Sequence, residues 1–152
     1  MVVIITGTPG TGKTTLASRL AHEEGRAVLS ISDVLEQEGL DSEWDAGNQC
    51  FLVDVVALSS VLERHAREDP ELIIDGHLSY EIDPSLVSRC IVCKCELSEL
   101  KRRLEERGYG EGKVRENLDC EIFDVCFVDA LERGHAPEVF WSSEGSSEFL
   151  DE

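Results

Sequence analysis

The sequence has few basic residues and no long apolar run. Its 152 residues include 14 Lys and Arg against 32 Asp and Glu, a formal net charge of −18. Such a surface repels polyanions, so we expect neither broad nor sequence-specific binding of nucleic acid. No stretch approaches the roughly 18 apolar residues of a membrane-spanning helix, and we expect no membrane association. The charge leaves two interpretations open, a solvated surface that aids solubility and a surface for a basic partner.

The N-terminus lacks the basic leader and the small-residue cleavage site of a secretory signal. We therefore expect the apolar segment 1–6 to be a core strand and the protein to act inside the cell, in the cytoplasm or the nucleus. Internal repeats and signs of a second core are also absent. The length suits one domain, residues 1–152, that buries a substantial core.

Six cysteines are present, at positions 50, 90, 93, 95, 120 and 126. For a protein inside the cell we expect reduced thiols rather than disulfides. The spacing Cys90-x-x-Cys93-x-Cys95 permits a zinc hypothesis, but there is no matching second pair. In a strand, Cys93 and Cys95 would share one face and Cys90 the other, so buried thiols that act as small hydrophobes are the favoured interpretation.

The most informative stretch joins an apolar run to a helix-like segment through Gly7-Thr-Pro-Gly-Thr-Gly-Lys-Thr14. This is the phosphate-loop pattern G-x-x-x-x-G-K-[ST] between a buried strand and a helix. Glycines let the backbone approach a ligand closely, and the loop N–H groups with the helix N-terminus form an anion site. Lys13 is expected to reach the β- and γ-phosphates of ATP and Thr14 to ligate Mg²⁺. The alternative, a glycine-rich turn before a chance Lys-Thr pair, is disfavoured because both flanking elements are present.

Apolar runs alternate with helical periodicity along the rest of the chain. We expect strands at 1–6, 27–30, 71–75, 90–95 and 137–141, and helices at 13–24, before Gly39, and at 52–67, 98–107 and 111–133. Segment 40–50 is interpreted either as a mobile loop over the site or as an ordinary surface connection. Alternation of this kind predicts an α/β fold of three layers, about five parallel strands between helices, with the ligand at the carboxyl ends of the strands.

Two side chains follow the apolar strand that ends near position 75. Asp75 is placed to hold Mg²⁺ through water or to orient a nucleophile beside the γ-phosphate, and its alternative role is to cap the turn. His77 is placed to position water or to contact the phosphates, and its alternative role is purely structural.

Basic residues cluster just before Gly108-Tyr-Gly110. Charge that develops on a transferred phosphoryl group needs cations besides Lys13. Arg107, beside the glycine-flanked turn, is the candidate to close over the phosphates, with Arg103 one turn earlier as its support. Lys101 and Arg102 are interpreted as a solvated face paired with nearby glutamates.

Together, four segments resemble a known family. They are Gly7-Thr-Pro-Gly-Thr-Gly-Lys-Thr-Thr15, Ile74-Asp-Gly-His77, Arg103-Leu-Glu-Glu-Arg-Gly-Tyr109 and Lys113-Val-Arg-Glu-Asn-Leu-Asp-Cys-Glu-Ile-Phe123. The chain resembles, over roughly residues 1–135, the nuclear adenylate-kinase-like ATPases, the adenylate kinase isoenzyme 6 family of eukaryotes and archaea.

The resemblance implies an adenylate-kinase-type phosphate-loop fold, with a monophosphate-binding region at about 30–53 and a short lid at about 106–116. It implies that ATP is bound by the residues Gly10, Gly12, Lys13, Thr14, Thr15 and Arg107. It links Asp75 and His77 to Mg²⁺ and to ATP hydrolysis. Family members transfer a phosphoryl group between ATP and AMP or related monophosphates, hydrolyse ATP, and bind a basic small-subunit ribosomal protein during ribosome maturation.

Three functional hypotheses follow. The first is a Mg²⁺-dependent ATP:AMP phosphotransferase with accompanying ATPase activity. The second is an ATP-dependent assembly factor in small-subunit rRNA maturation, in which the nucleotide controls release of a basic ribosomal protein. The third is a kinase for another small metabolite. One departure bears on all three: no Arg or Lys lies between Arg26 and Arg64, where the phosphate of a monophosphate requires a cation.

Overall fold

A computed structural model describes residues 1–40, 43–45 and 50–142, with segments 43–45 and 50–52 described by their backbone only. The strands are β1 (Val2–Thr6), β2 (Val28–Ser30), β3 (Glu43–Asp45), β4 (Cys50–Leu52), β5 (Ile73–Asp75), β6 (Val87–Lys94) and β7 (Pro137–Trp141). The helices are α1 (Lys13–Glu24), α2 (Ile31–Glu38), α3 (Val55–Glu68), α4 (Leu97–Glu106), α5 (Glu111–Ile122) and α6 (Val125–Glu132), and short 3-10 helices span η1 (His77–Glu81) and η2 (Pro84–Leu86).

Five strands form one parallel sheet in the order β2-β5-β1-β6-β7. The central strand β1 is apolar apart from Thr6, and all its residues are buried, as a strand covered on both faces requires. Strands β5 and β2 lie on one side of β1, and strands β6 and β7 lie on the other. The chain therefore reverses direction across the sheet beside β1, which in parallel α/β sheets is where ligands bind.

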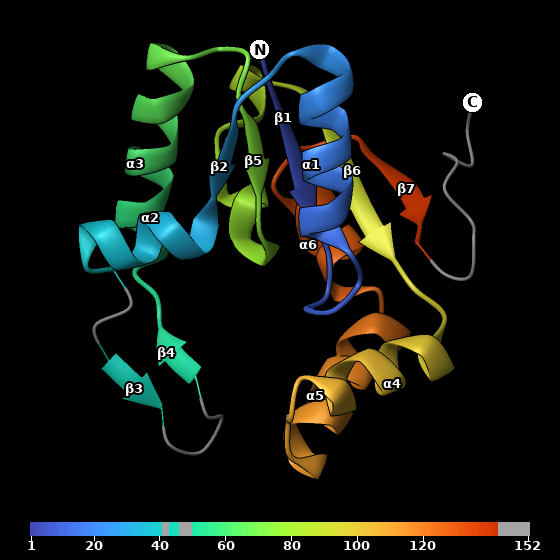
Figure 1. Cartoon of the computed structure of the whole chain (residues 1–152). Coiled ribbons are helices and arrows are strands. Elements are labelled where there is room, and N and C mark those ends of the chain that lie inside the picture. The colour runs from blue at the N-terminus through green and yellow to red at the C-terminus, as the bar shows by residue number, and fades with distance from the viewer. Residues whose placement is uncertain (41–42, 46–49, 143–152) are drawn as a thin grey trace.

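Helices cover both faces of this sheet (Figure 1). One face packs against α1 through a cluster that includes Val3, Ile5, Leu16 and Leu20. The opposite face packs against α2, α3 and α6, and its cluster contains Val2, Ile4, Val34, Leu58, Leu62, Ile74 and Ala130. Alternate residues of β1 thus serve opposite faces. The predicted three-layer arrangement with about five parallel strands is confirmed. No helix in the described ranges has the length and apolar character to cross a bilayer.

The long helix predicted for 111–133 is wrong. The structure has two helices, α5 and α6, separated by Asp124 in the left-handed conformation with φ of 55°. The inward positions of α5 are Val114, Asn117 and Glu121, whereas Ile122 is 53% exposed. A helix predicted from apolar periodicity would face the core with apolar residues, whereas the structure buries two polar ones, Asn117 and Glu121.

The segment between α2 and α3 contains a short antiparallel pair, β3 and β4. Of the predicted loop 40–50, residues 41–42 and 46–49 lie outside the described residues, as does the tail 143–152. Helix α3 begins at Val55 rather than at 52, because the Asp54 carboxylate accepts a hydrogen bond of 3.1 Å from the Ala57 N–H and caps the helix. Strand β6 also begins three residues earlier than predicted.

The cysteines near the end of β6 are buried in three different parts of the core. Cys90 belongs to the cluster under α3 and α6, Cys93 to the cluster under α1, and Cys95 to a third cluster beneath α4 and α5. The favoured interpretation of these three as buried small hydrophobes is confirmed. Within the described ranges, no group of three or more Cys, His, Asp or Glu side chains could hold a metal ion.

Candidate active site

The loop between β1 and α1 has a backbone that only glycine tolerates at its first position. Gly7 has φ of 148°, and a Cβ there would lie 2.5 Å from the Cys93 carbonyl oxygen on β6. Within the loop, the Thr11 N–H and hydroxyl both donate to the Thr8 carbonyl, at 3.2 and 2.7 Å. The loop is therefore a tight turn held against β6, with a fixed shape.

The loop leads directly into the N-terminus of α1. Gly12 occupies the N-cap position with φ of 100° and no side chain caps the helix, so the first-turn N–H groups face the cavity without an internal acceptor. Lys13 Nζ donates to the carbonyls of Gly7 and Thr8, at 3.0 and 3.2 Å, and so lies over the loop. Burial lowers the pKa of Lys13, and the nearby Asp75 carboxylate opposes this shift. The arrangement is a site for a polyanion.

Asp75 ends β5 at the carboxyl edge of the sheet, paired in register with Ile5 of β1. Its Oδ2 accepts a hydrogen bond of 2.9 Å from the Thr14 hydroxyl. Burial raises the pKa of Asp75, while the Thr14 hydrogen bond and the Lys13 charge lower it. A hydroxyl and a carboxylate oxygen thus lie together beside the anion site. Mg²⁺ prefers such oxygen ligands and takes its remaining ligands from phosphates and water, so these residues fit that ion.

His77 lies two residues beyond Asp75, at the start of η1. Its carbonyl accepts a hydrogen bond of 2.6 Å from the Thr6 hydroxyl, and its Nδ1 lies 3.8 Å from Cys126 Sγ. Burial, followed by the Lys13 charge, lowers the pKa of His77 to about 4. The imidazole is therefore neutral near pH 7 and able to accept or donate a hydrogen bond to a bound water or hydroxyl.

All predicted site residues line a single cavity of about 390 Å³: Gly10, Gly12, Lys13, Thr14, Thr15, Asp75, His77 and Arg107. Ser30 and Ser32 complete its far wall. A second cavity of about 570 Å³ is also lined by Gly10, Gly12 and Arg107. It extends over Leu16, Arg19 and Phe140. The exposed Arg107 thus stands where the two cavities join, at the C-terminus of α4.

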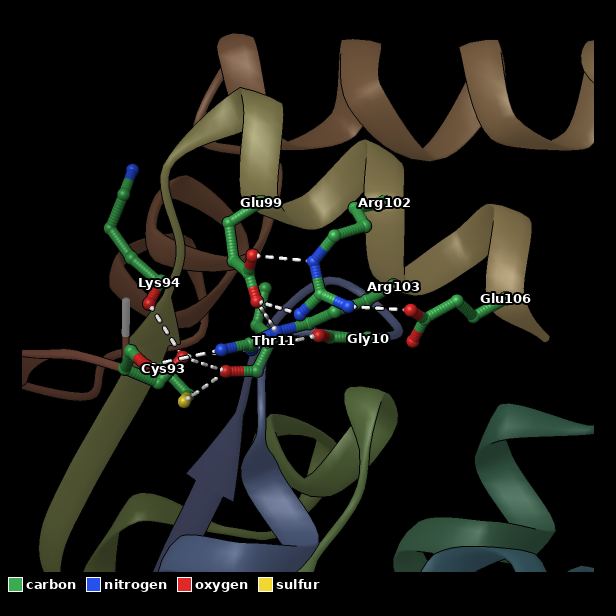
Figure 2. Close-up of polar contacts among 9 residues, drawn as sticks. Gly10, Thr11, Cys93, Lys94, Glu99, Arg102, Arg103 and Glu106 are labelled. Atoms are coloured by element: carbon green, nitrogen blue, oxygen red, sulfur yellow. Dashed lines mark hydrogen bonds and ion pairs between the residues drawn. The ribbon is translucent and has the colours of Figure 1, made fainter. Parts of the chain in front are cut away.

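Arg103, predicted as the support of Arg107, lines the larger cavity with it and also ties α4 to the phosphate loop (Figure 2). Its guanidinium donates to the Gly10 carbonyl at 3.2 Å and to the Ser142 hydroxyl and carbonyl at 3.2 and 3.1 Å. The Glu99 carboxylate accepts from its Nε at 3.0 Å and orients it. Arg102 forms ion pairs with Glu99 and Glu106 at the surface, which confirms its interpretation as part of a solvated face.

Replacing Arg103 with alanine should weaken ATP binding more than the chemical step. The change removes the cation that fixes the Gly10 carbonyl and Ser142, so we expect the KM for ATP to rise about 10-fold, the equivalent of one lost charged hydrogen bond. Steady-state kinetics at saturating acceptor measures this. Arg102→Ala, which removes a neighbouring surface cation, should leave KM unchanged. An equal effect of both changes would contradict the positioning role of Arg103.

Two contributors to the site, Glu121 and Ser142, were not anticipated. The buried Glu121 accepts from the Thr8 hydroxyl at 3.1 Å and from the Cys95 N–H at 2.9 Å, so it joins α5 to the phosphate loop. The Ser142 hydroxyl, after β7, donates to the carbonyl of Thr11. The available signal for Glu121 was its place in the family motif Cys120-Glu-Ile-Phe123, because a charged side chain does not count as a core position in an apolar pattern.

Comparison with known proteins agrees with this geometry. Residues 3–124 match the model of a family described as an AAA domain. A protein from Methanocaldococcus jannaschii named "Putative adenylate kinase" is 32% identical over 100% of this chain and 83% of its own length, and an Archaeoglobus fulgidus protein of the same name is 39% identical over 92% and 71%. The adenylate kinase isoenzyme 6 homolog of Caenorhabditis elegans is 29% identical over 86% and 72%. The chain belongs to the adenylate kinase isoenzyme 6 family.

Solved structures place this family member among phosphate-loop kinases by fold. Shikimate kinase from Acinetobacter baumannii superimposes with a TM-score of 0.65 over 95% of this chain and 85% of the kinase, at 14% identity. Deoxyadenosine kinase from M. mycoides gives 0.56 over 91% and 89%, at 15% identity. At such identities the likeness concerns the α/β phosphate-loop fold alone.

Proposed function

We propose that this protein is a Mg²⁺-dependent nucleoside monophosphate kinase that transfers the γ-phosphoryl group of ATP to AMP or a related monophosphate. One observation carries the proposal: a single cavity is lined by the phosphate loop, the Thr14–Asp75 pair and the exposed cation Arg107. Its relatives named as adenylate kinases support it.

The donor nucleotide occupies both cavities in this proposal. The loop N–H groups and Lys13 bind the β- and γ-phosphates, and Arg107 approaches them from the lid, segment 106–116. Thr14 and Asp75 hold Mg²⁺, which supplies charge neutralisation to the phosphates when bound. The larger cavity, lined by Leu16, Phe140 and other residues, offers an apolar wall for the base.

The acceptor enters beside Ser30 and Ser32, with region 30–53 as its binding region. Residues 27–63 contain no Lys, Arg or His but eight acids: Asp33, Glu36, Glu38, Asp41, Glu43, Asp45, Asp54 and Glu63. The acceptor phosphate must therefore be neutralised from the other side of the cavity. Arg107 lines that side, and the charge of Lys113 on α5 reaches His77. His77, neutral at pH 7, orients the attacking oxygen.

The experiment is a measurement of ADP formation by the purified protein with ATP, Mg²⁺ and each nucleoside monophosphate in turn. We expect an accepted monophosphate to accelerate ADP formation well above the rate with ATP alone, and either nucleotide to raise the melting temperature. ATP consumption that no monophosphate accelerates would reject the kinase assignment. Phosphorylation of a different small metabolite would move the assignment to another kinase class.

A second candidate function is ATP hydrolysis by an assembly factor that acts inside the cell on a basic small-subunit ribosomal protein during rRNA maturation. The net charge of −18 and the acidic acceptor region favour it, because both attract a cationic partner and neither favours a second phosphate. The test is to measure the affinity for such a basic protein with ATP and with ADP. An affinity indifferent to the nucleotide would count against this role.

A further inference from the structure

Two cysteines meet under the phosphate loop although they belong to different helices. Cys120 is on α5 and Cys126 is on α6, and the left-handed Asp124 between them turns the chain so that both thiols point inward. Each thiol is the largest influence on the acidity of the other: Cys126 lowers the pKa of Cys120 and Cys120 raises the pKa of Cys126, so the two side chains are neighbours. An unbroken helix would have separated them, since residues six apart lie on different faces. The break between α5 and α6 therefore creates a dithiol.

The dithiol contacts two parts of the candidate active site, the phosphate loop and His77. Cys120 Sγ accepts a hydrogen bond of 3.5 Å from the Thr8 hydroxyl of the phosphate loop. Cys126 Sγ lies 3.8 Å from His77 Nδ1, and the His77 carbonyl accepts a hydrogen bond from Thr6 at the end of β1. Oxidation of Cys120 would therefore alter its contact with the phosphate loop, and oxidation of Cys126 would alter its contact with His77.

The thiols of this pair differ in exposure and acidity. Cys120 is half-buried and Cys126 is buried. The neighbouring Cys126 thiol, followed by the hydrogen bond from Thr8, lowers the pKa of Cys120 to about 7, whereas burial raises the pKa of Cys90 to about 12. The thiolate is the reactive form of cysteine, so Cys120 is the attacking sulfur and Cys126 stands ready to resolve it.

We propose that Cys120 and Cys126 form a redox-active pair that a hydroperoxide oxidises to a disulfide, and that this disulfide slows catalysis. The Cys120 thiolate attacks the peroxide oxygen, the O–O bond breaks, and the sulfur becomes sulfenic acid as hydroxide or alkoxide leaves. The Cys126 sulfur then attacks the Cys120 sulfur, the S–O bond breaks, and the proton of Cys126 leaves with the oxygen as water. Overall, two thiols are oxidised to one disulfide and the hydroperoxide is reduced to water and an alcohol or a second water.

The disulfide would alter two hydrogen-bonded contacts of the site. Shortening the sulfur–sulfur separation to a covalent bond draws Cys120 away from Thr8 or Cys126 away from His77. Because small displacements of positioning groups cost up to about 100-fold in rate, we expect phosphoryl transfer to slow by about 10-fold or more and to recover with a dithiol reductant. This activity readout rests on the proposed function.

Mass spectrometry tests the chemistry without that assumption. Cleavage after Arg115 and Arg133 releases peptide 116–133, which contains Cys120 and Cys126 and no other cysteine. After treatment of the intact protein with hydrogen peroxide, we expect this peptide to lose two hydrogen atoms and to regain them on reduction. A peptide that keeps its mass, or that only gains oxygen, would overturn the proposal even if the kinase assay succeeds.

Cysteine variants test whether the Cys120–Cys126 disulfide slows phosphoryl transfer. For each protein the ratio of the peroxide-treated to the reduced rate is measured. We expect a low ratio for the wild type and for Cys90→Ala, a control in the core, and a ratio near one for Cys120→Ser. In Cys126→Ser, Cys120 should stop as sulfenic acid that a cyclic 1,3-dione captures. Equal peroxide sensitivity of Cys120→Ser and the wild type would refute the link between the pair and activity.

Discussion

Replacing Lys13 with alanine should lower the rate of phosphoryl transfer from ATP by about 10³-fold or more. The Lys13 ammonium lies over the phosphate loop and donates to two of its carbonyls, so it needs no rearrangement to meet a γ-phosphate. Negative charge that develops there loses its preorganised partner in the variant. The measurement is ADP formation at saturating ATP and monophosphate, which isolates kcat.

Arg102→Ala is the matched control for Lys13→Ala. It also removes one positive charge, but from the exposed face of α4, where Arg102 pairs with Glu99 and Glu106. We expect its rate to stay within about twofold of the wild type, because surface ion pairs contribute little. A Lys13→Ala variant that keeps its melting temperature and full activity would remove the phosphate loop from the mechanism.

Gly7→Ala is expected to destabilise the protein by about 2–4 kcal/mol. The new Cβ would lie 2.5 Å from the Cys93 carbonyl oxygen and 2.9 Å from Thr11 Oγ1, at a φ of 148° that L-residues rarely adopt. The Cys93 carbonyl belongs to the interior strand β6, where Cys93 pairs in register with Phe140 of β7, so it cannot move away without disturbing the pairing between β6 and β7. Urea unfolding monitored by circular dichroism measures the free energy of unfolding.

Gly112→Ala makes the same chemical change as Gly7→Ala but is expected to raise the free energy of unfolding. Gly112 lies in the first turns of α5, and a Cβ there would have no heavy atom within 4 Å. Alanine is the better helix former, so we expect this variant to gain about 0.5–1 kcal/mol. If both glycine variants shifted stability in the same direction, backbone geometry at Gly7 would not be the cause of its effect.

The sequence predicted the parts of the site that are local. The phosphate loop is one continuous motif, and the position of Asp75 follows from the end of an apolar strand that must lie beside β1 in a parallel sheet. The three-layer arrangement could also be predicted, because continuous apolar runs are typical of parallel strands that helices cover on both faces. These features depend on patterns within a few residues of each other.

The parts that could not be predicted depend on contacts between distant segments. Nothing near Arg103 in the chain indicates that its guanidinium reaches Gly10 and Ser142. The burial of Glu121 is hidden for the same reason, because its partners Thr8 and Cys95 are on other elements. An apolar pattern counts a charged glutamate as outward-facing. Its burial becomes favourable because the fold brings the Thr8 hydroxyl and the Cys95 N–H close enough to donate hydrogen bonds to it.

The hydrogen bond from Ser142 to Thr11 joins residues 131 positions apart, and it has a consequence for how the chain is made. During synthesis the first fifteen residues leave the ribosome long before β7 is translated. Until β7 docks beside β6, the loop lacks both Ser142 and the full set of partners for Arg103. A nascent chain therefore completes its phosphate loop late, when β7 joins the edge of the five-stranded sheet.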